Sequence, residues 1–250
     1  MASNRRLTAV AGRVEEFGWS ALRPVLRLRL AYFRHVIRTG TFPPRRPEAV
    51  TCAADHVGYL GSAAAARFGV LDDDLTTLSR VASQVGALRG RPFAWIEVAP
   101  GVLTVHDAAE SSSSLAEADV DAVVVALGFS DVLLMTSARA WQRDLDRLLD
   151  HARRPGRGLS PVIVAGIPPM HRFAQTARLG RGRIRRQVAR LDAATRTVVG
   201  RRGDCVFVPF PDPDDGAARV GPEFYSWAQV HKSWASALTP ELARLLDTHA

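Results

Sequence analysis

Hydrophobic residues along the chain alternate between short continuous runs and longer stretches with helical spacing. The continuous runs, rich in Val, Ile and Ala, predict five strands, at residues 56–61, 93–99, 120–128, 161–168 and 204–210. The stretches with helical spacing predict four helices, at residues 72–90, 138–154, 183–199 and 226–246. Strands that are apolar throughout and separated by helices are typical of a parallel sheet covered on both faces. The pattern therefore predicts a doubly wound α/β domain.

The segment before the first strand has a different pattern. Within residues 22–38 apolar side chains recur every third or fourth position, which predicts a helix with one apolar stripe and arginines on the adjacent face. We expect this helix to pack on the domain, because Arg29 interrupts its apolar side; the alternative is an interfacial helix that lies on anionic lipid. The predicted organisation is an N-terminal helical extension at 1–40, a Pro-rich linker at 41–54 and an α/β domain at 55–250.

The composition of the chain changes this picture only in part. The formal charge of +8 comes almost wholly from arginine, since Lys232 is the only lysine. Because the arginines are dispersed rather than gathered on one motif, we do not expect nucleic acid to be a partner. The two cysteines, Cys52 and Cys205, predict neither a disulfide framework nor a zinc site. We expect no metal ion and no other cofactor.

The sequence also bears on localisation. No apolar run reaches membrane-spanning length, and the N-terminus lacks an apolar core followed by a small-residue cleavage site. We therefore expect a cytoplasmic protein, which would lie at the inner face of the membrane if the helix predicted within residues 22–38 binds lipid.

Three segments of the domain resemble blocks of the SGNH (GDSL-type) hydrolases. Residues 120–149 resemble the third block, in which a buried strand ends in Gly-x-Asn-Asp, and residues 162–173 resemble the next strand with its Gly-x-Pro-Pro turn. Residues 221–238 occupy the place of the Asp-x-x-His segment and terminal helix. The resemblance covers about residues 55–245. It implies a flavodoxin-like three-layer α/β/α sandwich with a central parallel sheet, and a substrate class of acyl- or ester-bearing small molecules.

The first block of that family reads Gly-Asp-Ser, with the serine as nucleophile at the carboxyl edge of the sheet. Alignment on the Gly-Val pair at 69–70 puts Gly61 on the glycine, Ser62 on the aspartate and Ala63 on the serine. Alanine has no oxygen with which to attack an acyl carbon. The resemblance therefore implies that the nucleophile is missing.

The second and third blocks supply the oxyanion donors in that family. Val102 aligns with the glycine of the second block, with Gly101 one position early, so the close backbone approach of glycine would be lost. In the third block Gly128 matches, Ser130 replaces the asparagine and Asp131 matches. A serine hydroxyl can donate a hydrogen bond, but it is shorter and less preorganised than the asparagine amide.

The last block supplies the base histidine and its orienting aspartate. Tyr225 aligns with the histidine and Pro222 with the aspartate. Proline has no carboxylate, and a tyrosine with a pKa of about 10 is a poor base at neutral pH. Every letter of the S-G-N-H signature is thus altered, which predicts ester hydrolysis near the uncatalysed background.

Activity could be kept if a neighbouring residue served as the nucleophile. A one-residue gap would place Ser62 at the tip of the first strand, although a serine there also suits the cap of the Ala-rich helix that follows. Such a nucleophile needs a base, and His231 lies six residues after Tyr225, nearly two helical turns away. We expect His231 to be a surface residue of the last helix.

Other candidate residues are weaker. His106 and Asp107 are expected on a loop, where adjacent side chains rarely aim at one point, and His171 is expected near the rim of the pocket. The glycines of 178–186 do not fit a phosphate loop, and 212–215 lacks calcium-loop spacing, so we expect a solvated helix start and a turn.

The sequence therefore predicts an SGNH-like protein that is catalytically degenerate and retains a ligand or regulatory pocket. One alternative is an active esterase or acyltransferase on an acylated sugar or lipid, with Ser62 in a rearranged site and with Ser130 and Asp131 as further candidates. Another is a basic protein that binds a lipid surface or nucleic acid. The sequence makes no prediction of oligomeric state.

Overall fold

The computed structural model describes eight parts of the chain. They are residues 24–35 (except 29 and 33), 54–61, 69–97, 103–111, 119–152, 160–173, 180–211 and 226–248. Several predictions fall outside these residues, namely those for Ser62, Ala63, Gly101, Val102, Pro222 and Tyr225. They stay predictions, as do the domain boundaries, since residues 36–53 are also outside.

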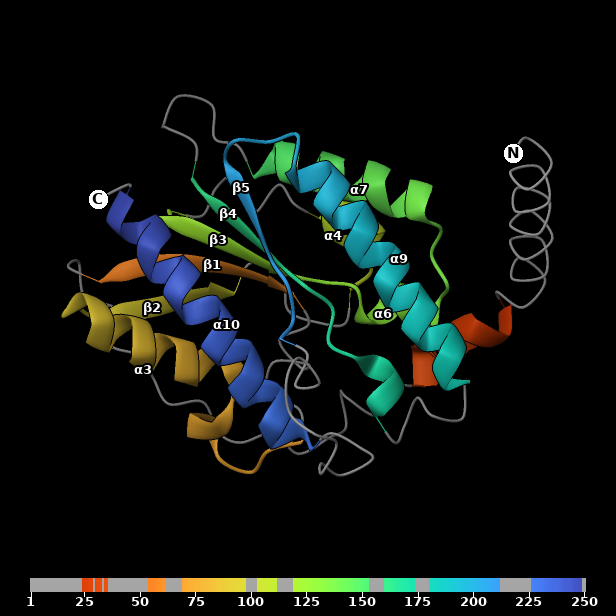
Figure 1. Ribbon diagram of the computed structural model, residues 1–250, viewed down its shortest axis with the longest axis horizontal. Helices are drawn as coiled ribbons and strands as arrows, with labels where there is room; N and C mark the ends of the chain where they lie inside the picture. The colour runs from red at the N-terminus through yellow and green to blue at the C-terminus, as the bar shows by residue number, and fades with distance from the viewer. Residues whose placement is uncertain are drawn as a thin grey trace, which may run out of the picture.

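Five parallel strands form the centre of the molecule (Figure 1). Their bounds are β1 Asp55–Gly61, β2 Phe93–Glu97, β3 Ala122–Ala126, β4 Val162–Ala165 and β5 Cys205–Val208. The strand order is β2-β1-β3-β4-β5. The central strand β3 is buried along its whole length, as its continuous apolar run predicts. The predicted parallel sheet is confirmed.

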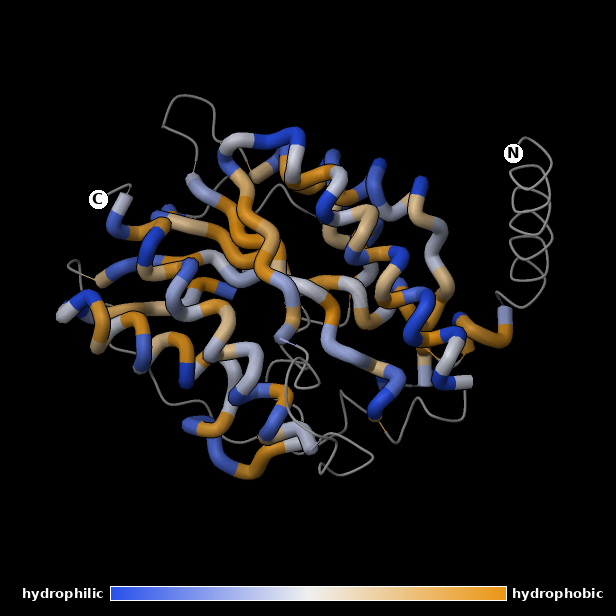
Figure 2. The backbone as a smooth tube through the Cα atoms, in the orientation of Figure 1, coloured by the Kyte–Doolittle hydropathy of each residue, from blue (hydrophilic) through white to orange (hydrophobic). Residues whose placement is uncertain are grey.

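Helices cover both faces of this sheet (Figure 1). On one face lie α3 Thr77–Arg89 and α10 Trp227–Thr248, and on the other lie α4 Val105–Glu110, α6 Phe129–Leu133, α7 Ala138–His151 and α9 Arg181–Val199. Side chains of β3 alternate between the two cores: Val123 and Val125 pack toward α7 and α9, whereas Val124 packs toward α10. Apolar residues accordingly gather between the layers and polar residues outside (Figure 2). The three-layer α/β/α sandwich is confirmed.

Short elements were missed by the sequence pattern. The predicted helix 72–90 is divided into a 3-10 turn, η1 Asp73–Leu75, and α3, because Thr76 is extended and its hydroxyl caps α3 by accepting from the Ser79 amide. The helices α4 and α6 and the 3-10 turn η2 Met170–Arg172 were not predicted. The expectation that His106 and Asp107 lie on a loop is wrong, since both belong to α4.

The described residues of 24–35, which we call the leader, are helical and pack on the domain, as expected. Leu26 and Leu30 are buried, and the Arg34 guanidinium donates to the Asp107 carboxylate of α4 at 3.0 Å. Because one stripe of this helix is withdrawn from water, the leader is part of the fold described here. No helix among the described residues combines the length and the apolar character needed to cross a membrane.

Candidate functional site

The strand order determines where a ligand site is expected. After β1 the chain moves to β2 on one side of the sheet, and then returns to β3 on the other side. Ligands of open α/β sheets bind outside the carboxyl ends of the strands at such a reversal. Gly61 at the end of β1 pairs in register with Ala126 at the end of β3, so both strands end at the same level of the sheet edge.

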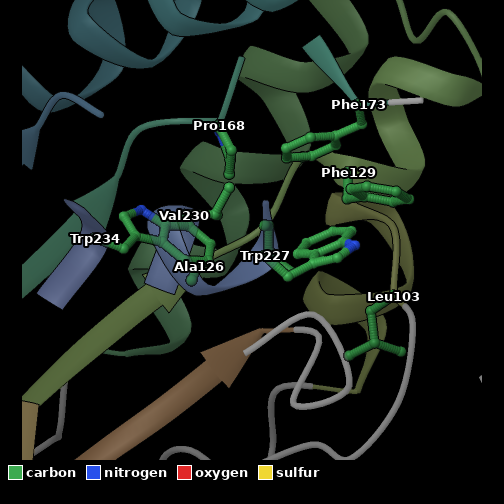
Figure 3. A pocket seen from close by; sticks show the side chains of 10 residues that line it. Leu103, Ala126, Phe129, Pro168, Phe173, Trp227, Val230 and Trp234 are labelled. Carbon is green, nitrogen blue, oxygen red and sulfur yellow. The ribbon is translucent and has the colours of Figure 1, made fainter. Parts of the chain in front are cut away.

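A narrow apolar crevice lies at this edge (Figure 3). Its free volume is about 20 Å³, which is space for little more than one water molecule. The described residues that line it are Leu103, Ala126, Leu127, Gly128, Phe129, Pro168, Phe173, Trp227, Val230 and Trp234. None of these side chains carries a hydroxyl, an imidazole or a carboxylate.

Aromatic rings make up much of this lining. Trp227, at the first turn of α10, packs against Phe173 with ring centroids 4.7 Å apart (Figure 3). The backbone of Gly69 passes directly beside Trp227, and a Cβ on Gly69 would stand 2.3 Å from the indole Cδ1. The sequence analysis did not single out Trp227 or Phe173 as site residues. Their places in the sequence could have indicated this role: Phe173 follows the turn after β4, and Trp227 begins the last helix, next to the segment that resembles the family's last block.

The turn after β3 places the residues of the family's third block. Gly128 has φ 112°, and a Cβ there would lie 2.5 Å from Ile167 Cδ1, so glycine is required at this turn. Ser130 follows in α6 and is 1% exposed. Its hydroxyl has no hydrogen-bond partner within the described part of the chain. Gly128 therefore lines the crevice, whereas Ser130 lies buried beside it.

Two further buried polar atoms near this edge lack a hydrogen-bond partner among the described residues: Tyr59 Oη and Trp234 Nε1. Tyr59 Oη lies beside Gly61, where a Cβ on the glycine would be 2.8 Å from it. Burial, with a smaller effect of Glu97, raises the pKa of Tyr59 above its ordinary value, so the phenol stays protonated. A buried polar group without a partner is unfavourable, by roughly 1–3 kcal/mol. A water or a ligand oxygen could satisfy these donors.

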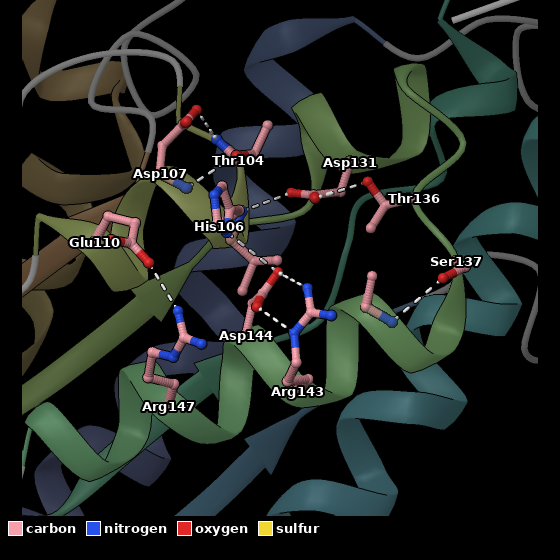
Figure 4. A network of polar contacts seen from close by, with 12 residues as sticks. Thr104, His106, Asp107, Glu110, Asp131, Thr136, Ser137, Arg143, Asp144 and Arg147 are labelled. Carbon is pink, nitrogen blue, oxygen red and sulfur yellow. Dashed lines mark hydrogen bonds and ion pairs between the residues drawn. The ribbon is translucent and has the colours of Figure 1, made fainter. Parts of the chain in front are cut away.

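Asp131 belongs to a polar network behind the crevice (Figure 4). Its carboxylate accepts from the Val105 amide and from the Thr136 hydroxyl, both at 2.9 Å. Burial raises its pKa to about 6; these two hydrogen bonds oppose the rise, and the nearby carboxylates of Asp107 and Asp144 add to it. Asp131 thus joins α6 to the start of α4. It does not line the crevice, so its role is to hold the turn after β3 in place.

A second, more polar cavity of about 510 Å³ lies between the leader helix and the helices α4, α6 and α7. Arg27 and Arg34 line it from the leader, and Asp131 and Asp144 line it from the domain. His106 Nδ1 lies 3.5 Å from Asp144 Oδ2. Among the described residues, no group of three His, Cys, Asp or Glu side chains could hold a metal ion.

His106 and Asp107 do not act as a pair. The Asp107 carboxylate accepts from the Thr104 amide in a capping box and from Arg34, whereas His106 faces Asp144 (Figure 4). Because the two side chains meet different partners, neither orients the other.

The expectation that His231 is a surface residue is wrong. His231 is fully buried, and its Nδ1 is 2.8 Å from the Thr77 hydroxyl, so it joins α10 to α3. It does not line the crevice. His171 lies in η2, half-buried and two residues before the crevice residue Phe173. His171 is thus close in sequence to the crevice without being one of its described lining residues.

Comparisons with known proteins agree with this architecture. No protein-family model matches the chain, and no curated protein does so with significance. Solved structures do match: TesA has a TM-score of 0.57 and 17% identity, with 76% of this chain and 99% of that one covered. Est24, a carbohydrate acetylesterase from Sinorhizobium meliloti, has a TM-score of 0.57 and 13% identity, covering 77% and 100%.

AlinE4, an SGNH-hydrolase family esterase, has a TM-score of 0.50 and 16% identity, with 78% of this chain and 98% of that one covered. At these identities the likeness concerns architecture, and the architecture is the one that the motifs predict. The five-stranded parallel sheet, its order and the glycine turn after β3 lead to one conclusion: the chain has the fold of the SGNH-hydrolase esterases.

Proposed function

We propose that this protein is a catalytically degenerate SGNH-fold protein that keeps the crevice at the carboxyl edge of the sheet as a binding site. The observation that carries the proposal is the altered signature: Ala63 stands in the place of the nucleophile and Tyr225 in the place of the base. The described lining of the crevice is apolar, which suits the binding of an apolar group. Loss of one triad member alone lowers turnover roughly 10⁴- to 10⁶-fold.

The rival proposal, an active enzyme with Ser62 as nucleophile, needs a base near the end of β1. His231 is a poor candidate, because it is buried and hydrogen-bonded to Thr77 on the α3 side of the sheet. The described crevice supplies no other imidazole. We therefore favour binding over hydrolysis.

The ligand that suits the crevice is a short acyl group. The walls are Trp227, Phe173 and other apolar side chains, which favour an apolar group. Because the free volume of about 20 Å³ holds little more than one water molecule, an acetyl group can enter only after a side chain such as Trp227 moves aside. One structural neighbour, Est24, is a carbohydrate acetylesterase, so we take acetyl esters of sugars or polyols as the first ligands to test.

Hydrolysis is tested with p-nitrophenyl acetate and the wild type, Ser62→Ala and Ala63→Ser. We expect the wild type and Ser62→Ala to release p-nitrophenol at the same rate as buffer, because no nucleophile–base pair is present. Turnover by the wild type that disappears in Ser62→Ala would establish the rival proposal. Ala63→Ser, which restores only the hydroxyl, should stay near background because the base is still absent.

Binding is tested by calorimetry with glyceryl triacetate as the acyl probe. We expect saturable binding to the wild type and at least tenfold weaker binding to Trp227→Ala, which removes one of the two indole rings that line the crevice. Trp95→Phe is the matched control, since Trp95 lies on the edge strand β2 and is not among the crevice residues. No binding by the wild type, or equal loss in both variants, would refute a retained acyl pocket.

A further inference from the structure

We propose that the helix at residues 24–35 docks this protein on an anionic membrane surface while it stays packed on the domain. Packing and membrane binding use different faces of the helix, so one does not exclude the other. The proposal is independent of whether the crevice binds an acyl group.

The inner face of the helix is buried against the domain. Leu26 is 9% exposed and Leu30 is 4% exposed. Arg34, on the neighbouring face, is held by the Asp107 carboxylate at 3.0 Å. These contacts leave the opposite side of the helix free of the domain.

The outer face is apolar where a solvated helix would be polar. Val25 is 55% exposed, and Leu28 and Tyr32 are each 71% exposed. The spacing i, i+3, i+7 places the three side chains on one stripe. Such a stripe is not required for packing on the domain, because Leu26 and Leu30 already provide that contact. Because exposed apolar side chains are unfavourable in water, this stripe favours a partner with an apolar component.

The charge of the chain favours a negatively charged partner. The first 47 residues contain ten arginines and two glutamates, which accounts for the whole formal charge of +8, so the remainder of the chain is neutral. The arginines are therefore less dispersed than the sequence analysis took them to be. Arg27, within the helix, is exposed, although it lies toward the polar cavity rather than on the outer stripe. A second copy of this chain would carry the same excess of positive charge in its first 47 residues, which disfavours self-association through this segment.

An anionic bilayer surface meets both requirements. Exposed Leu and Val side chains enter the acyl boundary, a Tyr ring lies at the headgroup level, and arginines contact lipid phosphates. Duplex nucleic acid would satisfy the arginines but would offer little to three exposed apolar side chains. The combination of an apolar outer stripe with concentrated positive charge thus points to lipid.

The test is sedimentation of the full chain with vesicles. We expect binding to vesicles of equal parts phosphatidylglycerol and phosphatidylcholine, and at least tenfold weaker binding to phosphatidylcholine alone. Leu28→Glu should weaken binding to the anionic vesicles at least tenfold. Leu88→Glu is the matched control: Leu88 is 66% exposed, lies on α3, and receives the same new charge. We expect it to change binding less than twofold.

Three outcomes would overturn the proposal: no binding to the anionic vesicles, equal loss in the two variants, or undiminished binding by Leu28→Glu. The last would mean that charge alone attracts the chain, as for nucleic acid. A second measurement follows insertion directly, with Tyr32→Trp and brominated phosphatidylglycerol. We expect this variant to be quenched more than the wild type, and equal quenching would place the outer stripe outside the bilayer.

Discussion

Asp131, which matches the family's third block, has a structural role in this fold. Sequence comparison matched it to the family's third block, yet its carboxylate is occupied by the Val105 amide and the Thr136 hydroxyl. Those two contacts join the turn after β3 to the helices on either side of it. The residue is useful to the fold whether or not its neighbour Ser130 serves in an oxyanion site.

The protonation of Asp131 gives a prediction for stability. Its pKa is about 6 in the folded state, against an ordinary value of 3.8. Its contribution to stability is therefore full below about pH 4 and is lost as the pH rises through 6. The side chain of Asp131→Asn is neutral at every pH, so the free energy of unfolding of the variant should not include this loss. Between pH 4 and pH 7 the difference in free energy of unfolding between variant and wild type should therefore shift in favour of the variant by on the order of 2 to 3 kcal/mol.

Urea denaturation of both proteins across this range measures the difference. The comparison must be between proteins rather than within one, because burial also raises the pKa of Asp192 to about 6. A difference between wild type and variant that does not vary with pH would contradict the prediction.

At the scale of elements, the turn from β3 into α6 is the most constrained junction near the crevice. Gly128 combines a positive φ with close contact to Ile167 from the loop after β4. A side chain there would force the two loops apart, and both loops contribute to the lining of the crevice. The width of the crevice thus depends on this glycine.

Gly128→Ala should lower the free energy of unfolding by roughly 2–4 kcal/mol, from backbone strain and overpacking together. Gly90→Ala is the control, because Gly90 also has a positive φ (63°) but no heavy atom within 4 Å of the added methyl. It should cost only about 1 kcal/mol. Chemical denaturation compares the two, and equal losses would show that the contact with Ile167 is unimportant.

The sequence predicted the main elements well because their signals are long or continuous. The strands β3 and β4 are apolar and buried along their whole length, and β1, β2 and β5 each contain an apolar run despite polar residues such as Asp55 and Glu97 at their ends. The helices α4 and α6 have six and five residues, too few for helical spacing to be seen. Element length, rather than composition, decided which elements could be found.

The site was predicted less completely than the fold. The position of Gly128 and Ser130 followed from a local motif after a strand, which sequence can register. The role of His231 depends on Thr77, a residue 154 positions away, so its burial had no local sign. The aromatic lining likewise joins Trp227 and Phe173 from separate elements, and only the topology brings them together.

At the scale of the whole molecule, the described residues of the leader, within 24–35, contact the domain through an ion pair and two buried leucines. The Arg34–Asp107 pair is about 40% exposed on each side, and such pairs contribute little. The buried side chains of Leu26 and Leu30 must therefore hold the helix in place. A polar cavity of about 510 Å³ remains beneath it, so the contact area is limited.

Limited trypsin digestion tests this account. Leu30→Asp should release the helix and speed cleavage after Arg27 roughly tenfold, because a charged side chain cannot be buried against the domain without a large penalty. Tyr32→Asp, which puts the same charge on the outer face away from the scissile bond, should leave the cleavage rate unchanged. Mass spectrometry of the products identifies the cleaved bond. If both variants are cleaved equally fast, the inner leucines do not anchor the helix.

The placement of the leader has a consequence for biosynthesis. Residues 24–35 leave the ribosome well before α7 at Ala138–His151 has been translated, although that helix forms part of the surface they cover. During this interval the α7 part of the surface that the helix covers is missing from the nascent chain. The leader is then apolar on two sides, and a chaperone or a nearby bilayer can engage it before its own domain does.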